Sequence, residues 1–119
     1  MGLVLLSSCE KETYVEHFIE NRSTSTITVN GTDIIHASGV DHAIPAGQKV
    51  AISSWTKRGK QTDLFPPTMM FGDDMIVTNA SGDTLTKDYT NLSNWSADVE
   101  DKRATASHDY VLIISDNDF

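Results

Sequence analysis

The chain has 119 residues, 39% of them hydrophobic, which suffices for one domain with a sizeable core. Its 9 basic and 17 acidic residues give a formal net charge of −8, which argues against nucleic acid, because phosphates favour a basic protein face. The same charge argues against electrostatic adhesion of the whole body to an anionic leaflet. A single cysteine excludes an internal disulfide, so packing and hydrogen bonds must hold the fold.

An apolar run near the N-terminus ends in two small residues and the only cysteine, Leu6-Ser7-Ser8-Cys9. This order of leucine, small, small and cysteine resembles a bacterial lipobox. The resemblance implies that cleavage makes Cys9 the first residue, with a diacylglycerol on its thiol and an acyl chain on its amino group. Two or more chains anchor a protein far more firmly than one. The alternative is an apolar tail with a chance cysteine.

The segment before Cys9 departs from a complete secretory leader, which has a positive start and an apolar run of about 7–15 residues. No Lys or Arg precedes the cysteine, and the apolar run covers only 3–6. A natural start upstream of Met1, or a trimmed sequence, would account for both. We therefore expect 1–8 to be a signal-peptide remnant, 9–13 the lipidated cysteine and its linker, and 14–119 the folded domain.

The residues after the cysteine, Glu10-Lys11-Glu12, resemble the surface-export signal of Bacteroides-type lipoproteins, in which Cys-x-Lys precedes acids. Thr13 stands where that family usually has a second acid, and an ordinary charged linker is the alternative. The resemblance implies a lipid-anchored protein of the bacterial outer membrane, either surface-exposed or periplasm-facing. No apolar run approaches the roughly 20 residues needed to span a bilayer, so we expect the lipid to be the anchor.

Short alternating runs separated by Gly, Pro, Asn, Asp and Ser recur after Glu12, which predicts an all-β fold. The expected strands cover 14–20, 24–30, 32–36, 50–55, 75–78, 84–86 and 108–114. In the first strand, Val15, His17 and Ile19 share a face. Asn30-Gly31 predicts a hairpin turn, because both residues tolerate positive φ.

Between these strands we expect a loop at 37–42, a turn at 44–48 and a cationic tip at 57–60. Two successive prolines supply no ladder donors, so 64–67 is expected to cross over a sheet edge. The stretch 88–106 is polar and weakly patterned, with a helical turn near 93–100. The last strand is apolar on both faces, which predicts a central position.

About seven strands with turns every 8–12 residues fit a two-sheet, immunoglobulin-like β-sandwich. A small closed β-barrel is the alternative. The ending His108-x-Tyr110-x-Leu112-x-Ile114-Ser115-x-x-Asp118-Phe119 resembles that of small Bacteroides-type lipoproteins of no established activity. This resemblance covers the C-terminal third, implies a sandwich, and transfers no functional residue.

Metal and catalytic motifs are weak. The four histidines, His17, His36, His42 and His108, lack the paired spacing and the third ligand of a zinc site, so we expect no metal and no cofactor. No nucleophile motif or phosphate loop occurs. Carboxylates are abundant, and two of them at a set separation could hydrolyse glycosidic bonds, which sequence alone cannot test.

Two tryptophans and one basic pair are the candidate ligand-binding residues. Trp55 and Trp95 could line a sugar platform, although tryptophans in such domains more often pack in the core. Lys57 and Arg58 belong to the basic cluster, which is either solvated or a contact for an acidic partner. We expect a non-enzymatic, membrane-anchored binding or scaffolding module for a glycan or partner protein. The alternatives are a small glycan-active hydrolase or accessory enzyme using acidic loop residues, and a periplasmic inhibitor.

Overall fold

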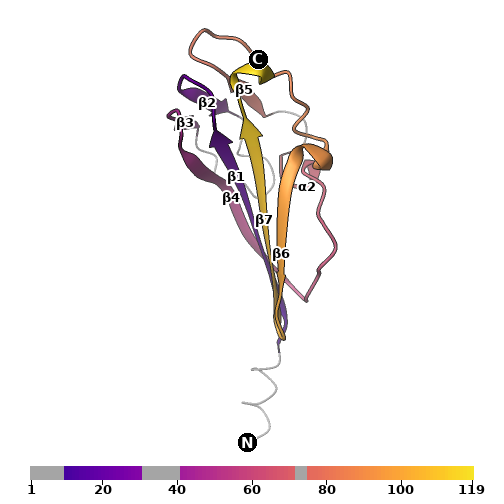
Figure 1. Ribbon diagram of the computed structural model, residues 1–119. Helices are drawn as coiled ribbons and strands as arrows, with labels where there is room; N and C mark the ends of the chain where they lie inside the picture. Colours follow the sequence, from indigo (N-terminus) through magenta and orange to yellow (C-terminus); the bar gives the residue numbers. More distant parts are fainter. Residues whose placement is uncertain (1–9, 31–40, 72–74) are drawn as a thin grey trace, which may run out of the picture.

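A computed structural model describes residues 10–30, 41–71 and 75–119 (Figure 1). In these residues seven strands form two open sheets, in the orders β4-β1-β7-β6 and β3-β2-β5. The predicted all-β sandwich of two sheets is therefore confirmed, and both sheets are open in the part of the chain that the structure describes. The strands are β1 (Glu12–Asn21), β2 (Ile27–Asn30), β3 (His42–Ile44), β4 (Lys49–Arg58), β5 (Ile76–Thr78), β6 (Trp95–Asp101) and β7 (Thr105–Ile114). The short helices are α2 (Thr68–Phe71), η1 (Leu92–Asn94) and η2 (Asp116–Asp118).

The centre of the larger sheet is a parallel pair, β1 and β7, in which every second residue is buried and the residues between are partly or fully exposed. Val15, Ile19, Tyr110 and Leu112 are among the inward residues that build the core. The apolar pattern on both faces of β7 thus correctly indicated a central strand. Because β1 and β7 run in the same direction, the described chain begins at one end of the molecule and finishes at the other (Figure 1).

The smaller sheet lies beside the C-terminal ends of β1 and β7 and not along their full length (Figure 1). We call this part, with β2, β3 and β5, the head. The remainder of the larger sheet, which we call the stalk, consists of residues 12–16, 54–58, 98–101 and 105–109. The segment that follows β4 covers the inner face of the stalk. In that segment Phe65 packs against Trp55 and His108, with ring centroids 5.8 and 4.9 Å apart.

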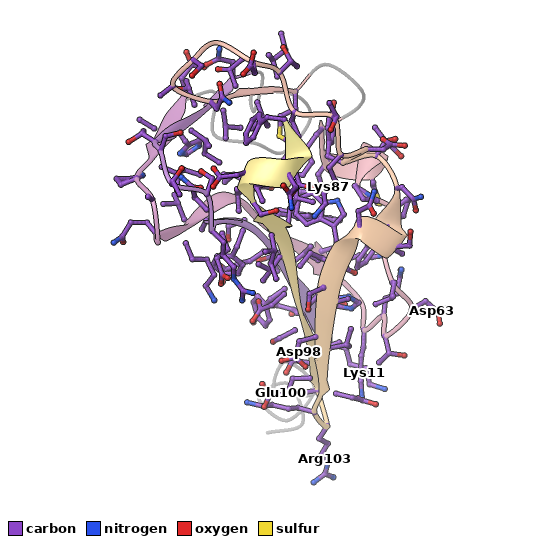
Figure 2. The ribbon with its side chains drawn as sticks, turned by 45° about the horizontal axis from the view of Figure 1, so that its top comes forward. Lys11, Asp63, Lys87, Asp98, Glu100 and Arg103 are labelled. Atoms are coloured by element: carbon purple, nitrogen blue, oxygen red, sulfur yellow. The ribbon has the colours of Figure 1, made fainter. Side chains whose placement is uncertain are left out.

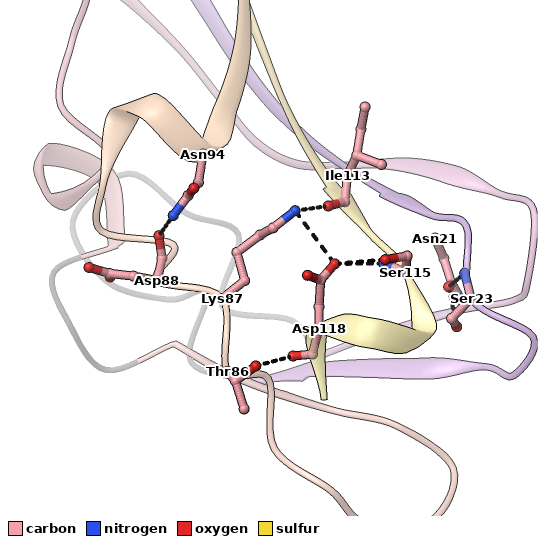
Figure 3. Close-up of polar contacts among 9 residues, drawn as sticks. All are labelled: Asn21, Ser23, Thr86, Lys87, Asp88, Asn94, Ile113, Ser115 and Asp118. Carbon is pink, nitrogen blue, oxygen red and sulfur yellow. Dashed lines mark hydrogen bonds and ion pairs between the residues drawn. The ribbon is translucent and has the colours of Figure 1, made fainter.

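One buried side chain ties together the corner where the chain crosses between the sheets. The Nδ2 of Asn21 donates to the carbonyls of Ser25 and Ile44, both at 2.8 Å. Its Oδ1 accepts from the backbone N–H of Ser23 at 2.9 Å and from the Ser23 hydroxyl at 2.6 Å (Figure 3). Gly47, with φ of +83°, donates its N–H to the Asn21 carbonyl at 2.7 Å. Both crossings therefore depend on one amide.

The C-terminal turn fastens a long loop onto the head (Figure 3). The Asp118 carboxylate accepts from the Ser115 N–H at 2.8 Å and pairs with Lys87 at 3.5 Å. The Asp118 carbonyl accepts from the Thr86 hydroxyl at 2.9 Å. The Lys87 ammonium also donates to the Ile113 carbonyl at 2.7 Å. These bonds hold the loop that precedes η1 against the end of β7.

Several expected boundaries were wrong. β1 begins at Glu12, so Glu12 and Thr13, assigned to the linker, belong to the sheet. β3 is a short strand between the expected loop and turn. The return strand expected at 84–86 is a single bridge between Thr78 and Thr84. The hairpin turn at Asn30-Gly31 and the strand expected at 32–36 lie outside the described residues, as does His36.

The largest error concerns the stretch in which a helical turn was expected near 93–100. The structure has a 3₁₀ turn at Leu92–Asn94, followed at once by the seven-residue strand β6. β6 is an outer strand that pairs only with β7, so most of its side chains remain exposed. Without a buried face, such a strand has no alternating apolar pattern to recognise.

Candidate functional site

Three segments that are far apart in sequence meet at the free end of the stalk. The Glu12 N–H donates to the Ala104 carbonyl at 3.1 Å, and the Gly59 N–H donates to the Lys11 carbonyl at 2.9 Å. The strand register agrees, since Glu12 pairs with both Arg58 and Thr105. We call this region the basic end and define it as residues 10–12, 57–60 and 100–105.

The basic end concentrates the positive charge of the chain. It holds six of the nine basic residues: Lys11, Lys57, Arg58, Lys60, Lys102 and Arg103. Its four acids are Glu10, Glu12, Glu100 and Asp101, so its local charge is +2. The remaining sequence has 3 basic and 13 acidic residues, a charge of −10. Figure 2 shows Lys11, Glu100 and Arg103 together at this end, with Lys87 distant from them.

Half of these cations are in ion pairs with acids of the same end. The pairs are Arg58–Glu10 at 3.4 Å, Lys102–Glu100 at 3.2 Å, and Lys60–Asp101. The side chains of Arg58 and Lys102 keep 88% and 63% of their surface exposed. Exposed pairs of this kind contribute about 0–1 kcal/mol, so another anion can replace the acid at little cost.

Buried contacts fix the geometry beneath these cations. The fully buried Thr13 hydroxyl donates to the Gly59 carbonyl at 2.7 Å and accepts from the Gln61 N–H at 2.8 Å. Gly59 has φ of +90°, which side-chain-bearing residues rarely adopt. The Tyr14 hydroxyl donates to the Glu12 carboxylate at 2.6 Å, and this bond and the carboxylate charge raise the pKa of Tyr14. The turn at Gly59 is therefore held in one geometry by its contacts with β1.

A second group of functional residue types lies inside the sandwich, where polar atoms form a continuous chain. The Phe65 N–H donates to the Tyr110 hydroxyl at 2.9 Å, which lies 2.8 Å from Nδ1 of His108. Nε2 of His108 lies 2.6 Å from the Gln61 carbonyl. Since a carbonyl only accepts, Nε2 must carry the proton, and in the neutral ring Nδ1 then accepts from Tyr110. Burial raises the pKa of Tyr110, partly offset by the Phe65 N–H.

The neighbouring His17 is buried among aromatic rings instead. It stacks on Tyr110 at 4.8 Å and meets Phe71 and Trp95 edge-on at 5.2 and 5.3 Å. Neither ring nitrogen has a hydrogen-bond partner among the described residues, nor does the Ser53 hydroxyl on the paired strand. Burial lowers the pKa of His17 to about 4. His17 and His108 are both fully buried, so a substrate could contact neither unless the structure opened.

The two tryptophans do not form one platform. Trp95 is 6% exposed, and its Nε1 donates to the Tyr89 carbonyl at 2.8 Å. Trp55 is half-buried and packs against Phe65. They stand on β6 and β4, the two outer strands of the larger sheet.

The basic pair Lys57 and Arg58 lies in the basic end, which Glu10, Lys11 and Glu12 of the export-like segment join. Lys57 donates to the Gln61 side chain at 2.9 Å and lies 5.7 Å from the Phe65 ring centroid. The lipobox and Cys9 lie outside the described residues, so the nearest described neighbour of Cys9 in sequence is Glu10. The basic pair and the export-like segment, which were predicted separately, thus lie together at one end of the sheet.

Lys60 belongs to the predicted cationic tip at 57–60, whereas Lys102 and Arg103 were not identified as site residues from the sequence. The available signal was that Lys102 and Arg103 lie between two runs that form the neighbouring strands β6 and β7. Lys60 links two of the turns directly, because its ammonium donates to the Lys102 carbonyl at 2.6 Å.

Across the described ranges, no three His, Cys, Asp or Glu side chains are grouped so that they could hold a metal ion. In the same ranges no helix is long and apolar enough to cross a bilayer.

Comparison with protein-family models, with curated proteins and with solved structures finds no match for this chain.

Proposed function

We propose that the protein is a lipid-anchored module of the bacterial outer membrane, held by acyl chains on Cys9, that binds or scaffolds a glycan or partner protein without catalysing a reaction. Its support is the position of Glu10, the residue after Cys9, in the basic end. The C-terminus and the smaller sheet lie at the opposite end (Figure 1). A lipid on Cys9 would hold the stalk at the bilayer and direct the head away from it.

The stalk would act as a spacer between such an anchor and the head. β1 and β7 have ten residues each, and at about 3.3 Å per residue each spans roughly 33 Å. The stalk, which takes up five residues of each strand, covers half of that length, so the head would begin roughly 16 Å from the membrane. The ends of β1 and β7 would lie at roughly 33 Å, where the loops of the head can meet a glycan or another protein. The hydrogen bonds at Asn21 and Asp118 keep those loops fixed.

A second candidate, a small glycan-active hydrolase, is favoured by one observation. Glu16, Asp109 and Asp98 form a row on the outward face across β1, β7 and β6, with Asp109 paired to both others. Neighbouring carboxylates can divide acid and base roles in glycoside hydrolysis. If this candidate holds, Asp109→Asn abolishes glycan cleavage by the purified protein. If wild-type protein cleaves none of a panel of envelope and plant polysaccharides, the candidate is rejected.

The proposed function is tested by the chemistry of Cys9. The protein is expressed in a Gram-negative host behind a complete lipoprotein leader, and its N-terminal peptide is weighed by mass spectrometry. We expect that peptide to begin at Cys9 and to carry a diacylglycerol and an acyl chain, and the whole protein to partition into detergent. Cys9→Ala should yield an unlipidated precursor whose folded domain melts at the unchanged temperature. An unmodified Cys9 in the mature wild-type protein would reject the anchor.

The proposed surface-export signal, Glu10-Lys11-Glu12, needs a variant of its own. Glu12 is unsuitable, because it is part of β1 and its replacement would also affect the sheet. Lys11 is exposed and precedes the strand, so Lys11→Ala is the suitable change. We expect Lys11→Ala to reduce cleavage by external protease on intact cells, whereas Lys102→Ala, an exposed lysine of the same basic end, leaves it unchanged. Equal accessibility of both variants and the wild type would mean that Lys11 is not an export signal.

A further inference from the structure

The geometry points to a second membrane contact: we propose that the basic end docks on the phosphate-bearing headgroups of an anionic lipid leaflet. This inference rests on the proposed function, because the lipid on Cys9 would bring the basic end to the bilayer. It adds that the protein surface itself binds the headgroups and so fixes the tilt of the stalk. The observation behind it is that the charges are separated along the sheet. The basic end has a charge of +2 and the remaining chain −10, although the net charge of the whole chain is −8.

The contact surface is made of turns that all face the free end of the stalk. Arg58 ends β4, Lys102 and Arg103 lie in the turn between β6 and β7, and Lys11 precedes β1. The side chains of Lys11 and Arg103 are exposed, as are those of Arg58 and Lys102. Exposed positive side chains from three separate segments thus gather at one end of the sheet, where Figure 2 shows Arg103 projecting beyond the end and Lys11 beside it.

Salt screening explains why the acidic remainder does not cancel this attraction. The Debye length is about 8 Å at physiological ionic strength. Among the acids outside the basic end, Asp63 follows Lys60 by three residues, at most roughly 10 Å along the chain, and Glu16 is four residues along β1 from Glu12, or roughly 13 Å at about 3.3 Å per residue. The acids of the head lie farther still. A leaflet at the basic end would therefore experience its +2 charge more strongly than the −10 of the remaining chain.

The internal ion pairs do not block such a contact. Those of Arg58 and Lys102 are exposed, and a headgroup phosphate can replace Glu10 or Glu100 as the partner at little cost. A lipid on Cys9 would also be covalently linked next to Glu10, so headgroups would be present at high effective concentration. Attraction of each lysine or arginine to an anionic leaflet changes binding about fivefold.

The test uses full-length Cys9→Ser protein, which cannot be lipidated, so that any binding reports the protein surface alone. It is sedimented with vesicles of phosphatidylcholine, either pure or mixed with phosphatidylglycerol, at low ionic strength. We expect binding to the phosphatidylglycerol vesicles alone, and its loss at high salt. The double reversal Lys102→Glu, Arg103→Glu should weaken binding by at least about 25-fold, because it removes two cations and also adds two carboxylates that the leaflet repels.

The matched control is Arg22→Glu with Lys49→Glu, which makes the same change in net charge at the other end of the sheet. We expect this control to bind like the parent protein, and circular dichroism must show that both variants fold. Inorganic phosphate at matched ionic strength should compete no better than chloride, because the partner is a lipid surface and not a single bound anion. Stronger competition by phosphate would contradict that assignment.

Equal binding to both vesicle types, or equal loss in both double variants, would overturn the docking proposal. Binding to neither vesicle type would also overturn it and would leave an acidic protein as the occupant of the basic end. The two proposals fail separately. Lipidated Cys9 with no vesicle binding rejects the docking alone, whereas vesicle binding with an unmodified Cys9 rejects the anchor and leaves a peripheral contact.

Discussion

His17 shows how a single buried side chain makes the stability of this protein depend on pH. Burial lowers its pKa to about 4 in the folded state, from 6.5 in an unfolded chain. Below about pH 6.5 the unfolded state therefore binds more protons than the folded state. With respect to His17, the unfolding free energy has its full value above about pH 6.5 and falls as the pH drops towards 4. The cause is desolvation by the rings of Phe71, Trp95 and Tyr110.

We expect wild-type protein to lose about 2 kcal/mol of unfolding free energy between about pH 7.5 and pH 5, since one pKa unit corresponds to about 1.4 kcal/mol. Urea denaturation at the two pH values measures this loss. His17→Leu removes the titrating group, so its loss over the same range should be smaller by that amount. The comparison cancels the carboxylates common to both proteins. The same pH dependence in both would show that His17 is solvated in the folded state.

Asn21 illustrates the opposite case, a buried polar side chain with every bond satisfied. Asn21→Ala leaves the carbonyls of Ile44 and Ser25 without their donor, and we expect unfolding free energy to fall by roughly 2–4 kcal/mol. Asn91 is the matched control, because its exposed Oδ1 accepts from the N–H and hydroxyl of Ser93 in the same pattern. Asn91→Ala should cost below about 1 kcal/mol. Similar losses in both variants would argue against the role of burial.

At the scale of elements, β7 is one of the two central strands of the larger sheet, because it pairs with β1 on one side and β6 on the other. Leu112→Ala should lower the unfolding free energy by roughly 2–5 kcal/mol through the cavity it leaves. Val111 points to the opposite face and is partly exposed, so Val111→Ala should cost below about 1 kcal/mol. Chemical denaturation of the pair measures this difference. A reversed order would mean that the two faces of β7 are exchanged.

The strands that the sequence predicted well are those whose residues alternate between core and solvent. β1 and β7 extend beyond the predicted 14–20 and 108–114, and the residues that were predicted to share a face of β1, Val15, His17 and Ile19, do so and point inward. The turn before β4 was readable for a local reason, since the Gln48 N–H donates to the Pro45 carbonyl at 3.1 Å and Gly47 has positive φ. Such signals are contained within a few residues, so they survive without tertiary context.

The missed elements depend on partners distant in sequence. β3 has three residues and exists because Ile44 pairs with Ile27. β6 is specified by its pairing with β7, and its acids, Asp98 and Glu100, face outward on the sheet. The basic end was missed for the same reason. Lys57 and Arg58 were recognised as a cluster, but only the pairing of β4, β1 and β7 brings Lys11 and Arg103 beside them.

The whole molecule is a polarised body, with a small positive end, a long stalk and a negatively charged head. This arrangement follows from the parallel pairing of β1 and β7, which separates the start of the domain from its finish. An antiparallel pair at the centre would return the chain to the basic end. The proposed anchor and the proposed headgroup contact both use the end where the domain starts, which leaves the loops of the head for a partner.

The most direct test of this orientation uses lipid-anchored protein on vesicles with nitroxide-labelled headgroups. With Cys9 occupied by lipid, one added cysteine can carry a fluorophore, either Ala104→Cys in the basic end or Ser81→Cys in the turn after β5. We expect strong quenching of the probe at 104 and little at 81, because the two sites are separated by roughly the 33 Å length of a ten-residue strand. Equal quenching at both sites, or stronger quenching at 81, would contradict the orientation.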